Sequence, residues 1–407
     1  MNTKHTIPVV VYLLGLTIFV VTTAEFMVAG MMPALSVALR VSVGEVGYLI
    51  SLYAFGMAIG GPVLTALLLA FRMPNKPALL WLLILYAAAG VLAAMATSYA
   101  VMAGARIVMG VASSACFGVS LSICADLVEP QERGRTSSLV FGGLMLAPVL
   151  GVPVTVFIEQ LFDWRASFWA VALLSMLCTV LVGAFVPASK KDDEVSLAAE
   201  FRSLFNGQLW AAFTTSGLII GAAFAAFSYF SPIFIEVSGA SPSAIPWLLA
   251  VYGAANVVGN LIVGRLADRY TMQVLAGGLG ILAVALGVFA LLADNLLVSI
   301  GAFLTIGLTG VALNPAMVAR VMRAATPGPL VNTMHTSLIT LGLAFGAWAG
   351  GVTIDAGYGL VSPLWVGLGL AVAGLVSVLP YLRGSRKTTK EPECTVDKGF
   401  LSCSGPG

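Results

Sequence analysis

Long apolar stretches recur along almost the whole chain, and they constrain the fold more than any other feature. A helix needs roughly 20 apolar residues to cross about 30 Å of hydrocarbon, and segments of that length follow one another from Val9 to Leu382. Hydrophobic residues make up 59% of the chain and charged residues only 9%, far from the composition of a water-soluble domain. The sequence therefore predicts an all-α membrane protein without a sizeable soluble domain.

We expect twelve transmembrane helices. The first segment carries no cleavage site of small residues and is too long for the apolar core of a signal peptide, so we expect it to remain as the first helix. The twelve segments lie at about residues 9–32, 45–70, 77–97, 99–124, 137–159, 166–186, 208–230, 243–264, 272–293, 296–318, 330–353 and 359–382.

Basic residues predict the orientation of the helices, because they gather in cytoplasmic loops. With the N-terminus inside, 17 of the 20 Lys and Arg lie on the cytoplasmic side, which leaves Arg40 and Arg165 outside and Arg106 within a helix. The opposite orientation would invert this ratio. We therefore expect both termini in the cytoplasm, and the net charge of +2 reflects this loop bias rather than a nucleic-acid surface.

The five cysteines show no metal-site or disulfide spacing. Cys116, Cys124 and Cys178 fall in expected helices, where we expect apolar packing, and Cys394 and Cys403 fall in a tail on the reducing side of the membrane. No phosphate loop, Walker motif or haem-ligand pattern appears. The sequence thus indicates no cofactor, no metal site and no enzyme activity. Without a site for ATP hydrolysis, any transport against a gradient would have to draw its energy from an ion gradient across the membrane.

One polar segment, VPASKKDDEVSLAAEFRSLFNGQ, divides the expected helices into six and six. We expect a six-helix bundle over residues 1–187, a cytoplasmic linker over 188–206, a second six-helix bundle over 207–383 and a disordered tail over 384–407. The halves look like copies, because NLIVGRLADRYTMQVL occupies the second loop of its half, as LTALLLAFRMPNKPALL does. Such duplication predicts a pseudo-two-fold axis and a substrate site near the midplane, between bundles that rock against each other.

At these loops the chain resembles the major facilitator superfamily, and the resemblance covers all but the last 20 or so residues. The stretch GRLADRY is similar to that family's Gly-x-Leu-Ala-Asp-Arg loop signature. The resemblance implies that this turn locks two helices in one state through ion pairs and charge–dipole contacts. The residues expected in this lock are Gly264, Arg265, Asp268 and Arg269.

The matching loop of the first half departs from the signature. Phe71 stands where the aspartate should be, and Arg72 and Lys76 follow it. We expect a degraded lock here. The alternative is that both loops are ordinary positive-inside anchors.

Two helices carry further motifs of the resembled family. GARIVMGVASSACFG places Arg106 four residues before a glycine, similar to a family signature in the fourth helix. In the fifth helix, GGLMLAPVLGVP resembles the Gly-Pro motif typical of antiporters, which implies export rather than uptake. Small residues and a proline would make this a packed, bendable seam, with generic small-residue packing as the alternative. The seam residues are Gly143, Ala147 (in place of the usual glycine), Pro148 and Gly151.

A single acid, Glu25, lies within the first helix, in TTAEFMVAG. Charges at membrane depth are costly and usually face a cavity or a partner. If the first helix runs outward and the fourth runs inward, Glu25 and Arg106 both lie about 5 residues, roughly 7 Å, to the outer side of their helix centres. Because loss of water favours a neutral carboxyl group and a nearby guanidinium favours a charged one, Glu25 is expected to exchange a proton in competition with substrate. The inert alternative is that Glu25 only neutralises Arg106 or a backbone group.

The rest of the expected cavity wall is weakly polar: Tyr53, Phe227, Asn256 and Asn314. One acid, one base and this wall suit a small neutral or amphipathic molecule better than a polyanion. We expect Asp355 to lie in solvent near an outer helix end and His335 to face an inner loop.

TAEFMVAGMMPAL and FDWRASFWAV are most similar to the twelve-helix drug–proton antiporter branch, which holds chloramphenicol-resistance exporters and the sugar and purine efflux permeases. The resemblance implies a monomeric secondary transporter of the bacterial inner membrane, with protons, the lipid bilayer and a small molecule (a drug such as chloramphenicol, a sugar or a metabolite) as partners. It implies proton-coupled efflux by alternating access. The alternatives are a transporter-like membrane sensor that influences gene expression and an uptake symporter.

Overall fold

The computed structural model describes residues 8–71, 73–129, 132–187, 206–324, 329–382, 394–397 and 400–403. Within these ranges, eleven helical segments are long and apolar enough to cross a membrane. The predicted all-α membrane architecture is therefore confirmed for the body of the chain, whereas the count of eleven differs from the expected twelve.

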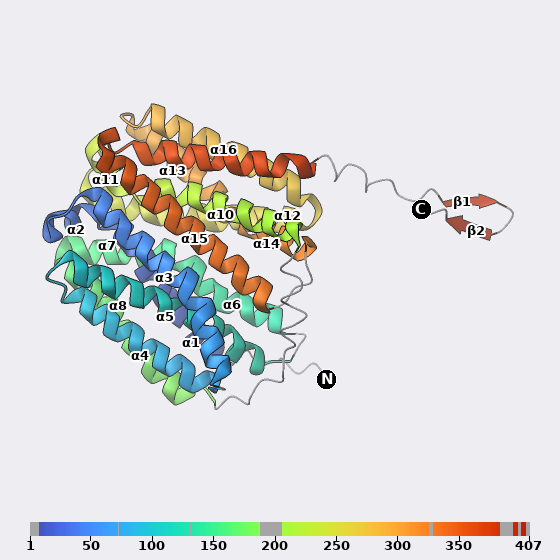
Figure 1. The fold of residues 1–407 in the computed structure, drawn as a ribbon, viewed down its shortest axis with the longest axis horizontal. Helices are drawn as coiled ribbons and strands as arrows, with labels where there is room; N and C mark the ends of the chain where they lie inside the picture. The colour runs from blue at the N-terminus through green and yellow to red at the C-terminus, as the bar shows by residue number, and fades with distance from the viewer. Residues whose placement is uncertain are drawn as a thin grey trace.

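The first half runs through six of these spans, and short helices or a π-helical turn interrupt or follow some of them (Figure 1). Its elements are α1 (Val9–Gly30), α2 (Met32–Leu39), α3 (Val43–Ala70), α4 (Asn75–Ala94), α5 (Tyr99–Asp126), α6 (Arg133–Leu146), the π-helix η1 (Ala147–Gly151), α7 (Val152–Leu161) and α8 (Trp164–Phe185).

The second half holds the remaining spans. Its elements are α10 (Gly207–Phe227), α11 (Phe230–Pro232), the π-helix η2 (Ile233–Val237), the 3-10 helix η3 (Pro242–Ala244), α12 (Ile245–Leu291), α13 (Leu296–Thr309), the 3-10 helix η4 (Val311–Leu313), α14 (Asn314–Ala324), α15 (Pro329–Thr353), the π-helix η5 (Ile354–Tyr358) and α16 (Ser362–Leu382).

Local chemistry explains where several helices begin. The side chains of Ser98, Asn206 and Asn295 accept hydrogen bonds from backbone N–H groups in the first turns of α5, α10 and α13. These side chains satisfy donors that have no partner inside a helix. At Tyr270, in contrast, α12 has non-helical backbone angles without ending.

The element α12 turns back at Tyr270. A straight helix would separate Tyr252 from Phe289 by about 55 Å. Yet Tyr252 stacks on Phe303 at 4.5 Å, Phe303 contacts Phe234 at 5.4 Å, and Phe234 contacts Phe289 at 5.5 Å. The two arms of α12 therefore lie close together, and they correspond to the expected segments 243–264 and 272–293.

The helices of the two halves occupy different parts of the molecule. Figure 1 shows the blue-to-green first half below and the yellow-to-red second half above, with α2 and α11 at the end opposite the last turn of α16. Between the halves, α3 packs against α15, while η1 and α7 pack against α12. One hydrophobic core runs through both halves.

The C-terminal tail contains two short strands. β1 (Cys394–Asp397) pairs antiparallel with β2 (Phe400–Cys403), and the register places Cys394 opposite Cys403. Two isolated strands are marginally stable in water at best. The rest of the tail and nearly all of the predicted linker lie outside the described residues, so the predicted disorder of the tail stays a prediction.

Candidate functional site

The guanidinium of Arg106 forms hydrogen bonds to the backbone of the first helix. Arg106 is 0% exposed in α5, and it donates to the carbonyl oxygens of Ala24 (2.6 Å) and Glu25 (3.0 Å) in α1 and of Leu49 (3.3 Å) in α3. Its charge also lies 4.2 Å from the ring centre of Tyr53. A carbonyl oxygen has two lone pairs, so each of these carbonyl oxygens can accept one hydrogen bond within its helix and one from Arg106.

Two tyrosines also form hydrogen bonds to the backbone of α1. The hydroxyls of Tyr53 from α3 and Tyr86 from α4 donate to the carbonyl of Val21 at 3.1 and 3.3 Å, and the two hydroxyl oxygens lie 3.4 Å apart. Three helices thus direct polar groups at two turns of α1. Tyr53, which was predicted from the sequence as a cavity residue, lies in this cluster. Tyr86 was not predicted, although it is the only tyrosine within the segment expected at 77–97.

Glu25 lies beside Arg106, but the two side chains are not paired. Glu25 as a whole is 5% exposed, and across the described ranges its carboxylate forms no hydrogen bond or ion pair. Arg106 instead contacts the main-chain oxygen of Glu25. The alternative in which the acid only neutralises Arg106 therefore has no direct contact to support it, because the donors of Arg106 are directed to carbonyl groups.

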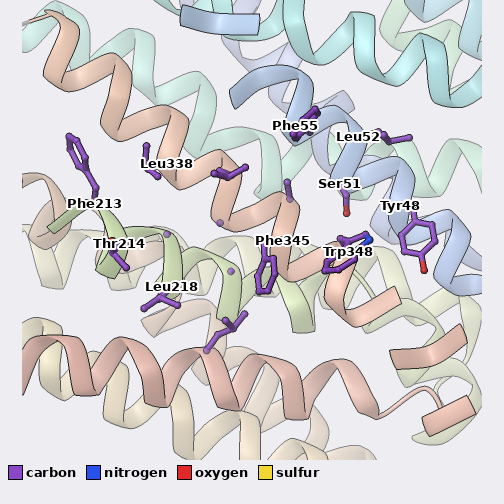
Figure 2. A pocket seen from close by; sticks show the side chains of 16 residues that line it. Tyr48, Ser51, Leu52, Phe55, Phe213, Thr214, Leu218, Leu338, Phe345 and Trp348 are labelled. Carbon is purple, nitrogen blue, oxygen red and sulfur yellow. The ribbon is translucent and has the colours of Figure 1, made fainter. Parts of the chain in front are cut away.

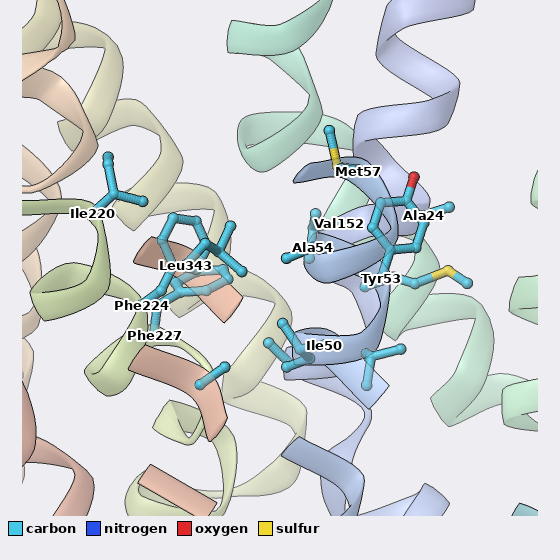
Figure 3. Packing of buried hydrophobic residues seen from close by; sticks show 14 of the residues in the cluster. Ala24, Ile50, Tyr53, Ala54, Met57, Val152, Ile220, Phe224, Phe227 and Leu343 are labelled. Carbon is cyan, nitrogen blue, oxygen red and sulfur yellow. The ribbon is translucent and has the colours of Figure 1, made fainter. Parts of the chain in front are cut away.

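An aromatic cluster begins at the residue after Glu25 and extends into the second half. Phe26 of α1 stacks on Phe224 at 5.3 Å and meets Phe227 edge-on at 6.0 Å. Phe227 in turn lies 5.0 Å from Tyr252. Figure 3 shows Phe224 and Phe227 on one side and Ala24 and Tyr53 on the other. Phe227 was a predicted wall residue, and Phe26 was not recognised, although it adjoins the acid.

Two predicted asparagines differ in their surroundings. Asn256 in α12 is buried, and its Oδ1 atom has no hydrogen-bond partner among the residues with described positions; the same is true of Thr22 Oγ1, one turn before Glu25. Unsatisfied buried polar atoms usually mark water or a bound group. Asn314 begins α14 and is only partly buried, and no described contact joins it to Glu25 or Arg106.

A cavity of about 660 Å³ lies elsewhere between the halves. It is lined by one face of α3 and by α10, α15 and α16, and its walls are almost entirely apolar (Figure 2). Phe55, Phe345 and Trp348, which line it, are also exposed. The six residues predicted for the substrate cavity do not line it: Glu25, Tyr53, Arg106, Phe227, Asn256 and Asn314. In α3, Tyr53 faces α1, whereas Phe55 faces this cavity.

The predicted seam is a place of very close backbone contact. A Cβ on Gly143 would lie 2.0 Å from the carbonyl oxygen of Gly15, and one on Gly151 would lie 2.0 Å from Thr23 Oγ1, so both glycines pack on α1. Ala147 and Pro148 begin the π-helix η1, as expected where proline removes a backbone donor. Pro148 also adjoins Gly253 of α12, so the seam touches the other half.

The predicted lock loop of the second half does not form its expected ion pairs in this state. Arg265, Asp268 and Arg269 are exposed around the turn at Tyr270, and the one ion pair in the described chain lies elsewhere. Exposed charges gain little from pairing because water competes. Arg323 at the end of α14 instead donates to the main-chain oxygen of Asp268, and Gly264 lies near Pro315.

The first-half loop makes an equivalent contact. Phe71 is exposed after α3, and Asn75 donates to the Asp126 carboxylate at the end of α5 at 3.3 Å. Each half thus ties its second loop to the end of its fourth helix. Lys76 is partly buried in the first turn of α4, and Arg72 lies outside the described residues.

Two basic residues of the second half are buried between helices. His335 is 5% exposed rather than on a loop surface, with its Nε2 2.9 Å from Ser216 Oγ. Arg320, which the orientation count assigned to the cytoplasm, is 4% exposed and donates to Thr215 Oγ1 at 2.7 Å. The helix α14 continues to Ala324, past the expected segment 296–318, and carries Arg320 between helices, whereas His335 lies within the expected segment 330–353 and faces α10.

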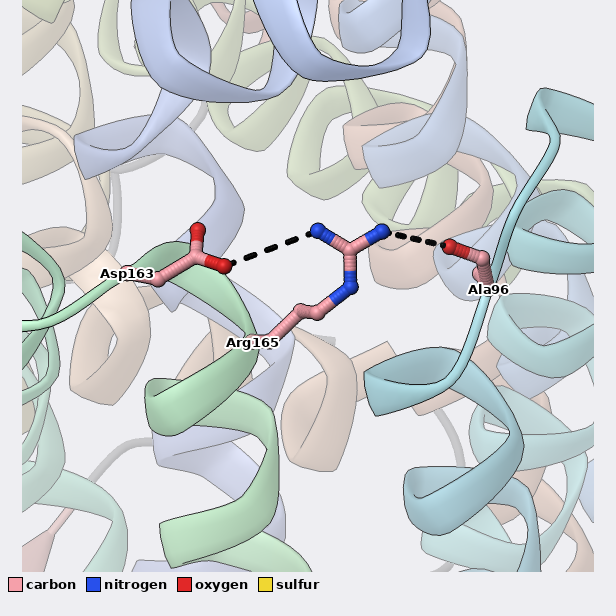
Figure 4. Close-up of polar contacts among 3 residues, drawn as sticks. All are labelled: Ala96, Asp163 and Arg165. Atoms are coloured by element: carbon pink, nitrogen blue, oxygen red, sulfur yellow. Dashed lines mark hydrogen bonds and ion pairs between the residues drawn. The ribbon is translucent and has the colours of Figure 1, made fainter.

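Arg165, from the WRASFW stretch, ties two connections together. Its guanidinium pairs with Asp163 at 3.5 Å and donates to the carbonyl of Ala96 at 3.1 Å (Figure 4). It also lies 4.2 Å from the ring centre of Trp164. These contacts hold the start of α8 against the end of α4. They indicate a structural role for this arginine.

Comparison with known proteins identifies the family. The family model of the Major Facilitator Superfamily matches residues 14–329 and again 238–400. The chloramphenicol resistance protein of Streptomyces lividans is 31% identical over 376 residues, which are 91% of this chain and 95% of that protein. The inner membrane transport protein YdhP of Escherichia coli (strain K12) is 31% identical over 382 residues, 93% of this chain and 96% of that protein.

Another relative, the uncharacterized MFS-type transporter YtbD of Bacillus subtilis (strain 168), is 29% identical over 95% of this chain and 98% of its own length. Among solved structures, a bacterial homologue of the human lysosomal transporter Spinster, in an inward-facing and occupied conformation, superposes with a TM-score of 0.71. It is 17% identical and covers 94% of this chain and 97% of its own. At that identity the likeness concerns the fold alone.

Proposed function

This chain belongs to the major facilitator superfamily of membrane transporters, and on that premise we propose that it exports a small neutral or amphipathic molecule in exchange for protons. The observation that carries the proposal is Glu25, a buried carboxylate without a hydrogen-bonding partner in the described chain. A carboxyl group in such a place is stable when neutral and costly when charged. Protonation and substrate can therefore compete for it.

The surroundings of Glu25 support this role. Arg106 is committed to three carbonyl groups, so it supplies a positive field beside the acid without occupying it. The Phe26, Phe224 and Phe227 rings offer an apolar surface next to the carboxyl group. An amphipathic molecule can place its polar part at Glu25 and its apolar part on these rings.

We place the site in a fold of twelve spans, arranged as two six-helix bundles related by a pseudo-two-fold axis. The return of α12 at Tyr270 supports this count, because each arm of α12 can form one span. The corresponding loop contacts of the two halves support the duplication. The basic residues favour cytoplasmic termini. The bacterial inner membrane follows from the name of one relative.

Export is favoured over uptake by two observations. The antiporter-like seam packs on α1, where a Cβ on Gly143 or Gly151 would meet backbone or side-chain atoms, and one relative is a chloramphenicol resistance protein. Uptake symport would use the same proton site in the opposite direction of flux. A sensor would instead need an output surface, for which the sequence offers only the 188–206 linker and the 384–407 tail.

To test the proposal, chloramphenicol is added to the purified protein and the release of protons is measured. The same measurement is repeated with a panel of other amphipathic drugs and sugars. Wild-type protein should release protons when a substrate binds. Glu25→Gln keeps the shape of the side chain but cannot ionise, so it should bind substrate without releasing protons, and vesicles that contain it should lose export against a gradient.

Glu236→Gln is the matched control, because Glu236 is an exposed carboxylate in η2. This variant should release protons as the wild type does. Undiminished release from Glu25→Gln would reject the proposed coupling group. A deletion of residues 385–407 distinguishes the sensor. If the deletion abolishes regulatory output and leaves transport unchanged, the sensor is favoured.

A further inference from the structure

Contacts between the halves close the end of the bundle where α1 finishes and α3 begins, here called the Gly30 end. Ser231 Oγ of the second half donates to the carbonyl of Gly30 at 3.2 Å. Gln160 Nε2 of the first half donates to the carbonyl of Pro242 at 2.7 Å. In the proposed orientation this end faces outward.

At this end Asp355 reaches from the second half onto the first. It lies in η5, directly after α15. Its Oδ1 accepts a hydrogen bond from the hydroxyl of Ser42 at 2.7 Å, and its Oδ2 accepts one from the hydroxyl of Tyr48 at 2.9 Å. Both oxygens of one carboxylate thus accept a hydrogen bond, one from the residue directly before α3 and one from its second turn. Hydrogen bonds to a charged acceptor are stronger than neutral ones.

The first turn of α3 is arranged to receive this carboxylate. Ser42 Oγ accepts from the N–H of Glu45 at 3.0 Å, and the N–H of Ser42 donates to Glu45 Oε2 at 2.8 Å. This reciprocal cap leaves the hydroxyl proton of Ser42 for Asp355. A Cβ on Gly44 would lie 2.4 Å from Asp355 Oδ1, so glycine leaves the space that the carboxylate occupies. The positive end of the α3 dipole adds attraction.

Close packing brings the end of α15 to this turn. A Cβ on Gly351 would lie 2.7 Å from the Tyr48 ring and 2.8 Å from the carbonyl oxygen of Gly44. Asp355 follows Gly351 by about one helical turn. Any movement that separates the two halves at the Gly30 end must therefore pull Asp355 away from Ser42 and Tyr48.

We propose that Asp355 is a latch between the halves, which holds the outer end closed through Ser42 and Tyr48 and must be released each time that end opens. The inference rests on the proposed export function, which requires the outer end to open and close, but it concerns the closed state rather than Glu25. Among the residues with described positions, four hydrogen bonds join the halves at this end, and the Asp355 carboxylate accepts two of them.

The test measures the distance between the halves by pulsed electron paramagnetic resonance in lipid nanodiscs. Spin labels are placed on Val37→Cys in α2 and Leu297→Cys in α13, two strongly exposed positions at this end, after Cys394 and Cys403 are replaced by Ser. Asp355→Ala should raise the ratio of the longer to the shorter distance at least tenfold, which corresponds to about 1.4 kcal/mol.

Two further variants make the result decisive. Ser42→Ala combined with Tyr48→Phe removes both donors and keeps Asp355, so it should shift the distances in the same direction, and it decides the question if Asp355→Ala does not fold. Asp294→Ala removes an exposed carboxylate between α12 and α13 and should leave the distances unchanged.

Unchanged distances in both latch variants, or an equal shift in Asp294→Ala, would overturn the latch. The outcome is independent of proton coupling. Failure of substrate-induced proton release in wild-type protein would reject the proposed function while the distance shift still stood. Normal release with no distance shift would reject only the latch.

Discussion

At the scale of single residues, Arg106 shows how a buried charge is satisfied without an opposite charge. Its planar guanidinium reaches three carbonyl oxygens on two helices and lies against a tyrosine ring. A point-like ammonium cannot reproduce this fork. Because these contacts join α5 to α1 and α3, Arg106 holds the helix that carries Glu25 in position.

Replacing Arg106 by Lys should therefore lower stability as well as transport. Hydrogen bonds from charged groups contribute about 1.5–3 kcal/mol each, so loss of one or two should lower the melting temperature of the detergent-solubilised protein by several degrees. Tyr53→Phe, which loses one neutral bond to Val21 and keeps the ring, should cost less. Equal melting temperatures for wild type and Arg106→Lys would show that the fork is unimportant.

At the scale of elements, the seam of α6 and η1 depends on the absence of side-chain atoms at particular positions. Gly143 packs on the backbone of α1, whereas a Cβ on the neighbouring Gly142 would meet nothing within 4 Å. The two glycines differ only in the side of the helix on which they lie. They form a matched pair for measuring what close approach contributes.

Gly143→Ala should destabilise the protein by about 1–3 kcal/mol, because the added methyl group overlaps the Gly15 carbonyl and forces the helices apart. Gly142→Ala should be neutral or slightly stabilising, since alanine favours a helix. Thermal unfolding and transport of the two variants, measured side by side, check this. Similar losses from both would assign the effect to the helix itself and not to its contact with α1.

At the scale of the whole molecule, the proposed orientation can be tested across a single span. Val37 in α2 and Phe71 after α3 are both strongly exposed, and α3 lies between them. With the tail cysteines replaced by Ser, a membrane-impermeant maleimide added to intact cells should label Val37→Cys and leave Phe71→Cys unlabelled. Permeabilised cells should label both. The reverse pattern in intact cells would invert the orientation.

The all-helical membrane architecture and the superfamily could be predicted from the sequence, because both depend on local properties. Apolar length determines which segments can lie in a bilayer, and short motifs such as GRLADRY persist as contiguous residues. A similar depth for Glu25 and Arg106 could also be predicted, since depth along a helix is a linear quantity, but depth alone does not predict that the two residues meet. The count of spans in the structure differed only where α12 continues through its turn at Tyr270.

Which atoms meet was decided by the tertiary structure alone. Arg106 binds carbonyl oxygens rather than the Glu25 carboxylate, His335 and Arg320 are buried, and Asp355, although exposed as expected, binds Ser42 and Tyr48 from the other half. These pairings depend on the rotation of each helix about its axis and on the approach of segments some three hundred residues apart, as between Ser42 and Asp355. In helices that are apolar on all sides, hydrophobic periodicity carries little information about rotation, so packing between the helices determines it.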